Sequence, residues 1–117
     1  MPPTVLVVDD EPDIREAVSE LLSEEGYDVV GASDGAEALT KLHTCHPTVV
    51  LLDLMMPGMD GWQFRAAQRE DPEVSGIPVI VLSALDRVSD LDAADFIQKP
   101  FDLDRLLSAV RHHAHAA

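Results

Sequence analysis

The sequence has few cysteines, few basic residues and no long apolar run, and each shortage excludes a class of protein. Cys45 is the only cysteine, so no disulfide can form within the chain, which suits a reducing compartment. Only 8 Lys and Arg stand against 22 Asp and Glu, and the formal net charge is −14. Binding to nucleic acid or to anionic lipid needs clustered basic residues. We therefore expect neither a nucleic acid nor a membrane as a partner.

The length and the hydrophobic content predict one folded domain. Hydrophobic residues make up 46% of the 117 residues, which is enough for a buried core. The apolar runs are too short to span a bilayer, and the first residues lack the basic start of a signal peptide. We expect residues 1–117 to form a single cytoplasmic domain, without an appended output domain.

Short apolar segments alternate with amphipathic ones along the chain. Runs rich in Val and Ile are typical of strands buried on both faces of a parallel sheet. The five predicted strands are Val5–Val8, Tyr27–Ala32, Val49–Leu52, Val79–Leu82 and Phe96–Gln98. The predicted helices begin near Pro12, Asp34, Gly61 and Phe101; the first ends at Gly26, the second runs through Leu42, and the last frays from His112. This alternation predicts a doubly wound α/β fold with helices on both faces of the sheet.

Ionisable and polar side chains follow four of the predicted strands. They are Asp9 and Asp10, Asp53, Ser83, and Lys99. In this fold class, function gathers at the carboxyl ends of the strands. Converging carboxylates favour a hard divalent cation, Mg²⁺ or alternatively Mn²⁺, and a carboxylate can also be a nucleophile that forms an acyl phosphate. Each acid alone could be a turn or helix cap, but four strand ends with complementary groups favour a site.

Four motifs in this order resemble one known family. The segment Val5–Glu11 resembles its first strand and acid pair, and Asp53–Gly61 resembles its phosphoacceptor motif D-x-x-x-P-x-x-D-G. Ser83-Ala84 stands where the family has Thr or Ser before a small residue, and Lys99-Pro100-Phe101 resembles its K-P-F signature. Over nearly its whole length the chain therefore resembles the receiver domain of bacterial two-component response regulators.

This resemblance implies a fold and a function. The fold would be a flavodoxin-like (βα)5 domain with parallel sheet order 2-1-3-4-5. The chain would be a single-domain response regulator, a phosphoacceptor that assists its own phosphorylation and dephosphorylation rather than an enzyme. Its partners would be a histidine kinase or phosphotransfer protein and a downstream protein target.

The resemblance also implies a role for each site residue. Asp53 would accept the phosphoryl group, and Lys99 would pair with that group through a loop with a cis Lys99-Pro100 bond. Ser83 and Phe96 would be the switch residues. The Mg²⁺ ligands would be Asp9, Asp10, Asp53 and the backbone carbonyl of Met55.

The chain departs from the family between Ser83 and Phe96, where only residues 84–95 remain for the crossover. A crossover between parallel strands needs about a dozen residues, so we expect the fourth helix of the family to be shortened or missing. Because the family usually dimerises through that region, we expect a monomer. Met55 and Leu85, which would flank the hydrolytic water, cannot orient it, and this predicts slow dephosphorylation.

Two other functions fit parts of the sequence. The chain could be an interaction adaptor that keeps the receiver fold without regulation by phosphorylation, although its complete set of acids, Ser83 and Lys99 argues against this. It could also be a small hydrolase or a flavin-binding domain of similar topology. The first strand is not followed by a Gly-rich phosphate loop, which argues against nucleotide or flavin binding.

Overall fold

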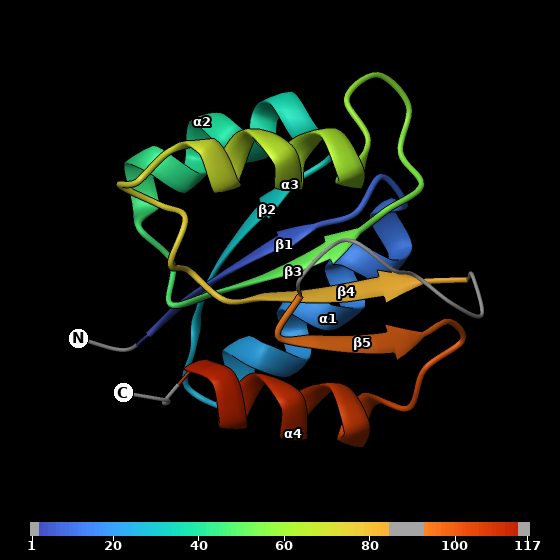
Figure 1. Cartoon of the computed structure of the whole chain (residues 1–117). Coiled ribbons are helices and arrows are strands. Elements are labelled where there is room, and N and C mark those ends of the chain that lie inside the picture. Colours follow the sequence, from blue (N-terminus) through green and yellow to red (C-terminus); the bar gives the residue numbers. More distant parts are fainter. Residues whose placement is uncertain (1–2, 85–92, 115–117) are drawn as a thin grey trace.

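The computed structural model describes residues 3–84 and 93–114, which form five strands and four helices (Figure 1). The strands are β1 (Thr4–Val8), β2 (Asp28–Ala32), β3 (Val49–Asp53), β4 (Val79–Ser83) and β5 (Asp95–Gln98). The helices are α1 (Pro12–Glu24), α2 (Gly35–Cys45), α3 (Gly61–Glu70) and α4 (Leu103–Ala114). All strand pairs are parallel, and the sheet order is β2-β1-β3-β4-β5. The predicted flavodoxin-like topology is confirmed.

The predicted element bounds hold to within a few residues, with one clear error at the end of the chain. Asp53 and Ser83 are the last residues of β3 and β4, in register with Leu82 and Gln98, rather than the first residues after them. The expected fraying from His112 is wrong as far as Ala114, since α4 continues to that residue. Ala114 packs against the core, which holds this last turn in place.

The predicted shortened or missing fourth helix falls mainly on residues 85–92, which lie outside the described residues. It stays a prediction.

Local sequence signals explain where the helices begin and end. Pro12 occupies the first turn of α1, where its missing N–H costs nothing, and Gly26 follows that helix with a φ of 93° that suits glycine. The Asp34 side chain accepts a hydrogen bond from the backbone N–H of Glu37 at the start of α2. Asp60 and Gln63 form a reciprocal capping box at the start of α3. That cap fixes where the loop after β3 turns into a helix.

The core has two layers, one on each face of the sheet. Helices α1 and α4 cover one face, and α2 and α3 cover the other (Figure 1). Alternating strand residues supply the two layers: Val5, Val7 and Leu51 face α1 and α4, whereas Leu6, Val8 and Leu52 face α2 and α3. Both layers bury their aliphatic side chains almost fully, so the sheet is a rigid platform for the loops at its carboxyl edge. Among the described residues, no helix has the length and apolar character to cross a membrane.

Candidate functional site

Two neighbouring strands bring the predicted carboxylates together at the carboxyl edge of the sheet. Asp9 and Asp10 directly follow β1, and Asp53 ends the neighbouring strand β3. One carboxylate oxygen from each of the three residues lies within 4.8 Å of the others. The expected convergence of these acids is confirmed by the geometry.

Lys99 enters the same cluster from the end of β5. Its Nζ donates a hydrogen bond to Asp9 Oδ2 at 3.0 Å and lies 3.5 Å from Asp53 Oδ2. The backbone N–H of Lys99 donates to the Ser83 carbonyl at 2.7 Å, and the Lys99-Pro100 peptide bond is cis, as expected. Lys99 therefore links the ends of β1, β3 and β5 electrostatically.

Asp9 is fully buried, and each of its polar atoms has a partner. Its N–H donates to the Ala32 carbonyl, and its Oδ1 accepts from the Glu11 N–H at 2.9 Å. Its Oδ2 accepts from Lys99, and its backbone carbonyl accepts from Arg15 Nη1 at 2.7 Å. Asp9 is thus a rigid anchor for the turn that carries Asp10.

Asp53 is 4% exposed, and this burial raises its pKa from the usual 3.8 to about 6. Lys99 opposes the shift, whereas the charges of Asp9 and Asp10 add to it. Burial alone would lower the pKa of Lys99, but its hydrogen bond to Asp9 and the charges of Asp9 and Asp53 raise it. Asp53 therefore carries a destabilised carboxylate beside a firmly protonated lysine.

The donor set fits a hard divalent cation. Among the described residues, three carboxylates share the cluster with one ammonium group, which leaves an excess of negative charge on these groups. All the ligands on offer are oxygens, which Mg²⁺ prefers. Met55 lies beside the cluster, where its N–H donates to Asp53 Oδ1 at 3.3 Å and its side chain is 59% exposed.

The loop after Asp53 closes back on the strand through a glycine. The Gly61 N–H donates to the Leu54 carbonyl at 3.0 Å. A Cβ at Gly61 would lie 2.7 Å from the Asp53 carbonyl oxygen, closer than side-chain carbons come to backbone atoms. Gly58, in the same loop, has a φ of 73°, a left-handed conformation that favours glycine. The glycines of the predicted acceptor motif thus let the loop close tightly beside Asp53.

The two predicted switch residues lie on neighbouring strands. Ser83 is fully buried at the end of β4. Phe96 is half-buried in β5 and packs against the core layer on the α2 and α3 side. Phe96 pairs with Val81, two residues before Ser83, so Phe96 and Ser83 face the same side of the sheet.

Arg15 is a contact of the site that the sequence analysis missed. Its signal in the sequence is that it is the one basic residue of α1, in a helix that also carries Asp13, Glu16 and two further glutamates. Its hydrogen bond to the backbone of Asp9 could not be read from that pattern, because a backbone acceptor leaves no mark in the sequence.

Comparisons with known proteins give the family of this chain. Residues 5–111 match the model of the response regulator receiver domain family. The chain is 36% identical over 115 residues to Protein PilG of Pseudomonas aeruginosa, covering 93% of this chain and 85% of that protein. It is 43% identical over 113 residues to a probable transcriptional regulator, ycf27, of Porphyridium aerugineum, covering 92% of this chain but 46% of that protein. The chain therefore spans less than half of some of the relatives that it matches.

Solved structures share the whole fold. The chemotaxis protein CheY4 of Vibrio cholerae superposes with a TM-score of 0.89 at 31% identity, over 97% of this chain and 99% of that one. A putative response regulator of Chloroflexus aurantiacus superposes with a TM-score of 0.91 at 29% identity, over 99% of this chain and 100% of that one. This chain belongs to the response regulator receiver domain family and is a phosphoacceptor signalling switch.

Proposed function

We propose that Asp53 accepts the phosphoryl group, from a histidine kinase or a phosphotransfer protein, and that the chain passes the signal to a downstream protein. The observation that carries this proposal is the placement of Asp53 between a lysine and two further carboxylates. Asp53 is 4% exposed, Lys99 Nζ lies 3.5 Å from its Oδ2, and Asp9 and Asp10 offer oxygens within 4.8 Å.

In the reaction, an ionised Asp53 oxygen attacks phosphorus. The new bond joins this oxygen to phosphorus, and the bond between phosphorus and the donor's histidine nitrogen breaks, after which that nitrogen takes up a proton. Asp53 must be ionised to attack, and Lys99 favours the ionised form. The same ammonium group is placed to pair with the phosphoryl oxygens after transfer, which is the kind of charge stabilisation that this chemistry needs.

Asp9, Asp10, Asp53 and the Met55 carbonyl would hold Mg²⁺. When bound, Mg²⁺ supplies positive charge that offsets the charge on the phosphoryl oxygens. Asp9 cannot easily move, because its polar atoms are all engaged, whereas Asp10 is half-buried at the edge of the cluster. We propose that Ser83 then hydrogen-bonds a phosphoryl oxygen and that Phe96 responds through its packing, since it has no hydroxyl.

Intact-mass analysis after incubation with acetyl phosphate and Mg²⁺ tests the acceptor. We expect one phosphoryl adduct, which is lost in EDTA and in Asp53→Asn. Asp60→Asn is the matched control, because it makes the same change in the same loop and asparagine also caps helices well. An adduct of equal yield in Asp53→Asn, or no adduct on the wild type under conditions that label other receivers, would contradict the proposal and favour the adaptor alternative.

A further inference from the structure

Arg15 makes a contact that its surroundings on α1 do not predict. It is the one basic residue in a helix that carries Asp13, Glu16, Glu20 and Glu24. Its guanidinium nevertheless donates through Nη1 to the backbone carbonyl of Asp9, at 2.7 Å. A short hydrogen bond from a charged donor is among the stronger kinds in proteins, so this contact must affect the turn that it reaches.

The Asp9 carbonyl belongs to the peptide that leads into Asp10. A peptide unit is planar, so fixing its carbonyl oxygen also fixes the direction in which the next residue leaves. The side chain of Asp9 is already held by Glu11 and Lys99. The bond from Arg15 therefore adds control over Asp10, the least buried of the three clustered acids.

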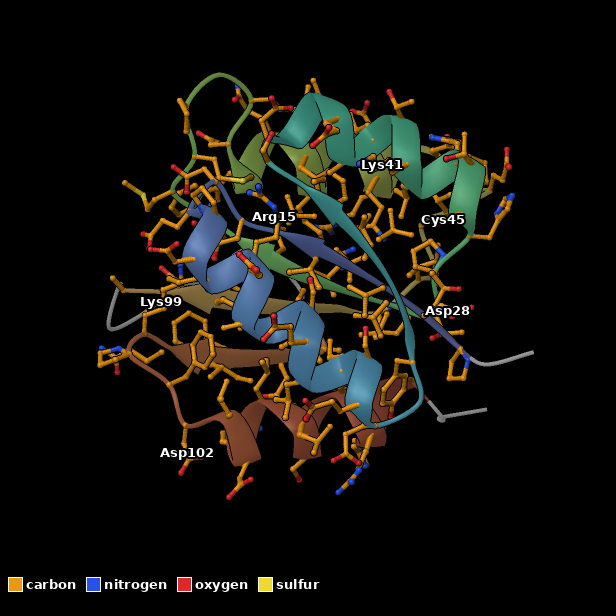
Figure 2. The ribbon with its side chains drawn as sticks, turned by 180° about the vertical axis from the view of Figure 1, so that it is seen from behind. Arg15, Asp28, Lys41, Cys45, Lys99 and Asp102 are labelled. Carbon is orange, nitrogen blue, oxygen red and sulfur yellow. The ribbon has the colours of Figure 1, made fainter. Side chains whose placement is uncertain are left out.

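A glycine in the edge strand makes room for the arginine. A Cβ at Gly31 of β2 would lie 3.3 Å from Arg15 Cδ, and 3.6 Å and 3.7 Å from Cγ and Nε. Glycine weakens a strand interior and often marks a close approach. From α2, Lys41 donates to the Gly31 carbonyl at 2.5 Å, and Figure 2 shows Arg15 and Lys41 reaching β2 from the two helices on either side of it. The Arg15 side chain thus packs across Gly31 on its way to the Asp9 carbonyl.

We infer that Arg15, supported by Gly31, is a positioning residue for the cation site. It orients the Asp9–Asp10 peptide so that Asp10 presents its carboxylate toward Asp53. The inference deepens the proposed function and rests on the cation site proposed there. Arg15 itself contacts neither the phosphoryl group nor the cation; it acts through the backbone of the turn.

The first test measures Mg²⁺ affinity directly, without phosphorylation. Trp62 is the only tryptophan and follows Gly61, which lies against the Asp53 backbone, so its fluorescence can report binding. Loss of a group that orients metal ligands commonly weakens binding 10- to 100-fold. We expect Arg15→Gln to weaken Mg²⁺ binding about tenfold and Arg15→Lys, which keeps the charge and a donor, to weaken it less.

Two further variants separate positioning from charge. Arg69→Gln removes the same charge from an exposed position on α3 and should leave Mg²⁺ affinity unchanged. Gly31→Val should displace the Arg15 side chain without changing any charge, and valine suits a strand. We expect Gly31→Val to weaken Mg²⁺ binding about as much as Arg15→Gln does. The double variant should lose little more affinity, because both substitutions remove the same hydrogen bond from Arg15 to Asp9.

Each contrary result overturns the inference. It fails if Arg15→Gln and Arg15→Lys bind Mg²⁺ like the wild type, or if Arg69→Gln loses as much affinity as Arg15→Gln. It also fails if the fold-losses in Mg²⁺ affinity of Arg15→Gln and Gly31→Val multiply in the double variant. Urea unfolding in EDTA checks that each variant is folded, and if Arg15→Gln is not, the Arg15→Lys and Gly31→Val comparison decides. A wild type that neither binds Mg²⁺ nor forms an adduct overturns the proposed function together with this inference. If the wild type binds Mg²⁺ and forms the adduct, and the Arg15 and Gly31 variants bind Mg²⁺ equally well, only the inference about Arg15 is overturned.

Discussion

At the scale of single residues, Asp53 shows how a site trades stability for reactivity. Its carboxylate is nearly buried beside Asp9 and Asp10, and Lys99 offsets only part of that cost. A carboxylate in such surroundings is poised to gain a counter-charge, either a cation or a proton. The folded protein therefore holds the Asp53 carboxylate in surroundings that disfavour its negative charge.

The pKa of about 6 for Asp53 predicts a pH-dependent gain in stability for Asp53→Asn. Because folding raises this pKa from 3.8, the ionised form lowers the free energy of unfolding above pH 6, and this cost fades as the pH falls toward 3.8. In EDTA, we expect Asp53→Asn to raise that free energy by on the order of 1–3 kcal/mol at pH 7.5 and by much less at pH 4.5. Urea denaturation at both pH values checks this, with Asp60→Asn as the control. An equal effect of Asp53→Asn on the free energy of unfolding at both pH values would show that burial does not raise the pKa of Asp53.

A second prediction at this scale concerns the lifetime of the phosphorylated protein. The exposed Met55 side chain has no amide or acid group that could hold a water for attack, and Leu85, which lies outside the described residues, has none either. We expect slow loss of the phosphoryl group, and a faster loss in the double variant Met55→Asn/Leu85→Glu. The decay of the adduct, followed by intact mass after the donor is removed, measures both rates. An unchanged rate in the double variant would count against this explanation.

At the scale of elements, His43 ties α2 to the segment that follows α3. Its Nδ1 lies 2.9 Å from the Leu39 carbonyl and its Nε2 lies 2.6 Å from Asp71 Oδ2. Both partners are acceptors, so the ring is best satisfied with a proton on each nitrogen. The hydrogen bond to Leu39 and the contact with Asp71 raise the pKa of His43, and the His43 hydrogen bond lowers the pKa of Asp71.

This pair predicts a stability contribution confined to mildly acidic and neutral pH. A raised histidine pKa stabilises the fold fully below pH 6.5 and ceases to do so as the pH rises through the raised value. The lowered Asp71 pKa stabilises the fold fully above pH 3.8, and this stability is lost as the pH falls through the lowered value. We expect His43→Gln to lower the melting temperature more at pH 5.5 than at pH 8.5. His112→Gln, exposed on α4, is the control. The same loss at both values would mean that His43 acts through packing alone.

At the scale of the whole molecule, the carboxylate cluster adds to a formal net charge of −14. Net charge of this size destabilises the compact state through repulsion, and the cluster concentrates that repulsion at one edge of the sheet. A cation held there should therefore stabilise the entire domain, since it binds the folded state and not the unfolded chain.

We expect Mg²⁺ at ten times its dissociation constant to add about 1.4 kcal/mol to the free energy of unfolding, or about 5 °C to the melting temperature. Thermal melts in Mg²⁺ and in NaCl of equal ionic strength separate binding from screening. Asp10→Asn should abolish the difference between the two salts. Equal melting temperatures in the two salts, with Mn²⁺ also without effect, would mean that the acids do not form a cation site.

The order of the elements, and the places along them where the polar site residues stand, could be predicted from the sequence. Apolar runs mark buried strands because a strand covered on both faces needs apolar residues throughout, and this pattern is local. Asp9, Asp10, Asp53 and Lys99 could be assigned to one edge because parallel strands all end there. The acceptor motif and its glycines could also be recognised in the sequence, because a tight loop is specified by residues that are adjacent in the chain.

The tertiary structure decided which of these groups meet and in what state. Lys99 lies closer to Asp9 than to Asp53, and Arg15 donates to a backbone carbonyl rather than to a neighbouring acid. His43 of α2 pairs with Asp71, which directly follows α3. No local pattern encodes these choices, because each depends on side chains brought together by packing between elements. The pKa of Asp53 has the same origin: it follows from burial, and burial is a property of the folded molecule rather than of any stretch of its sequence.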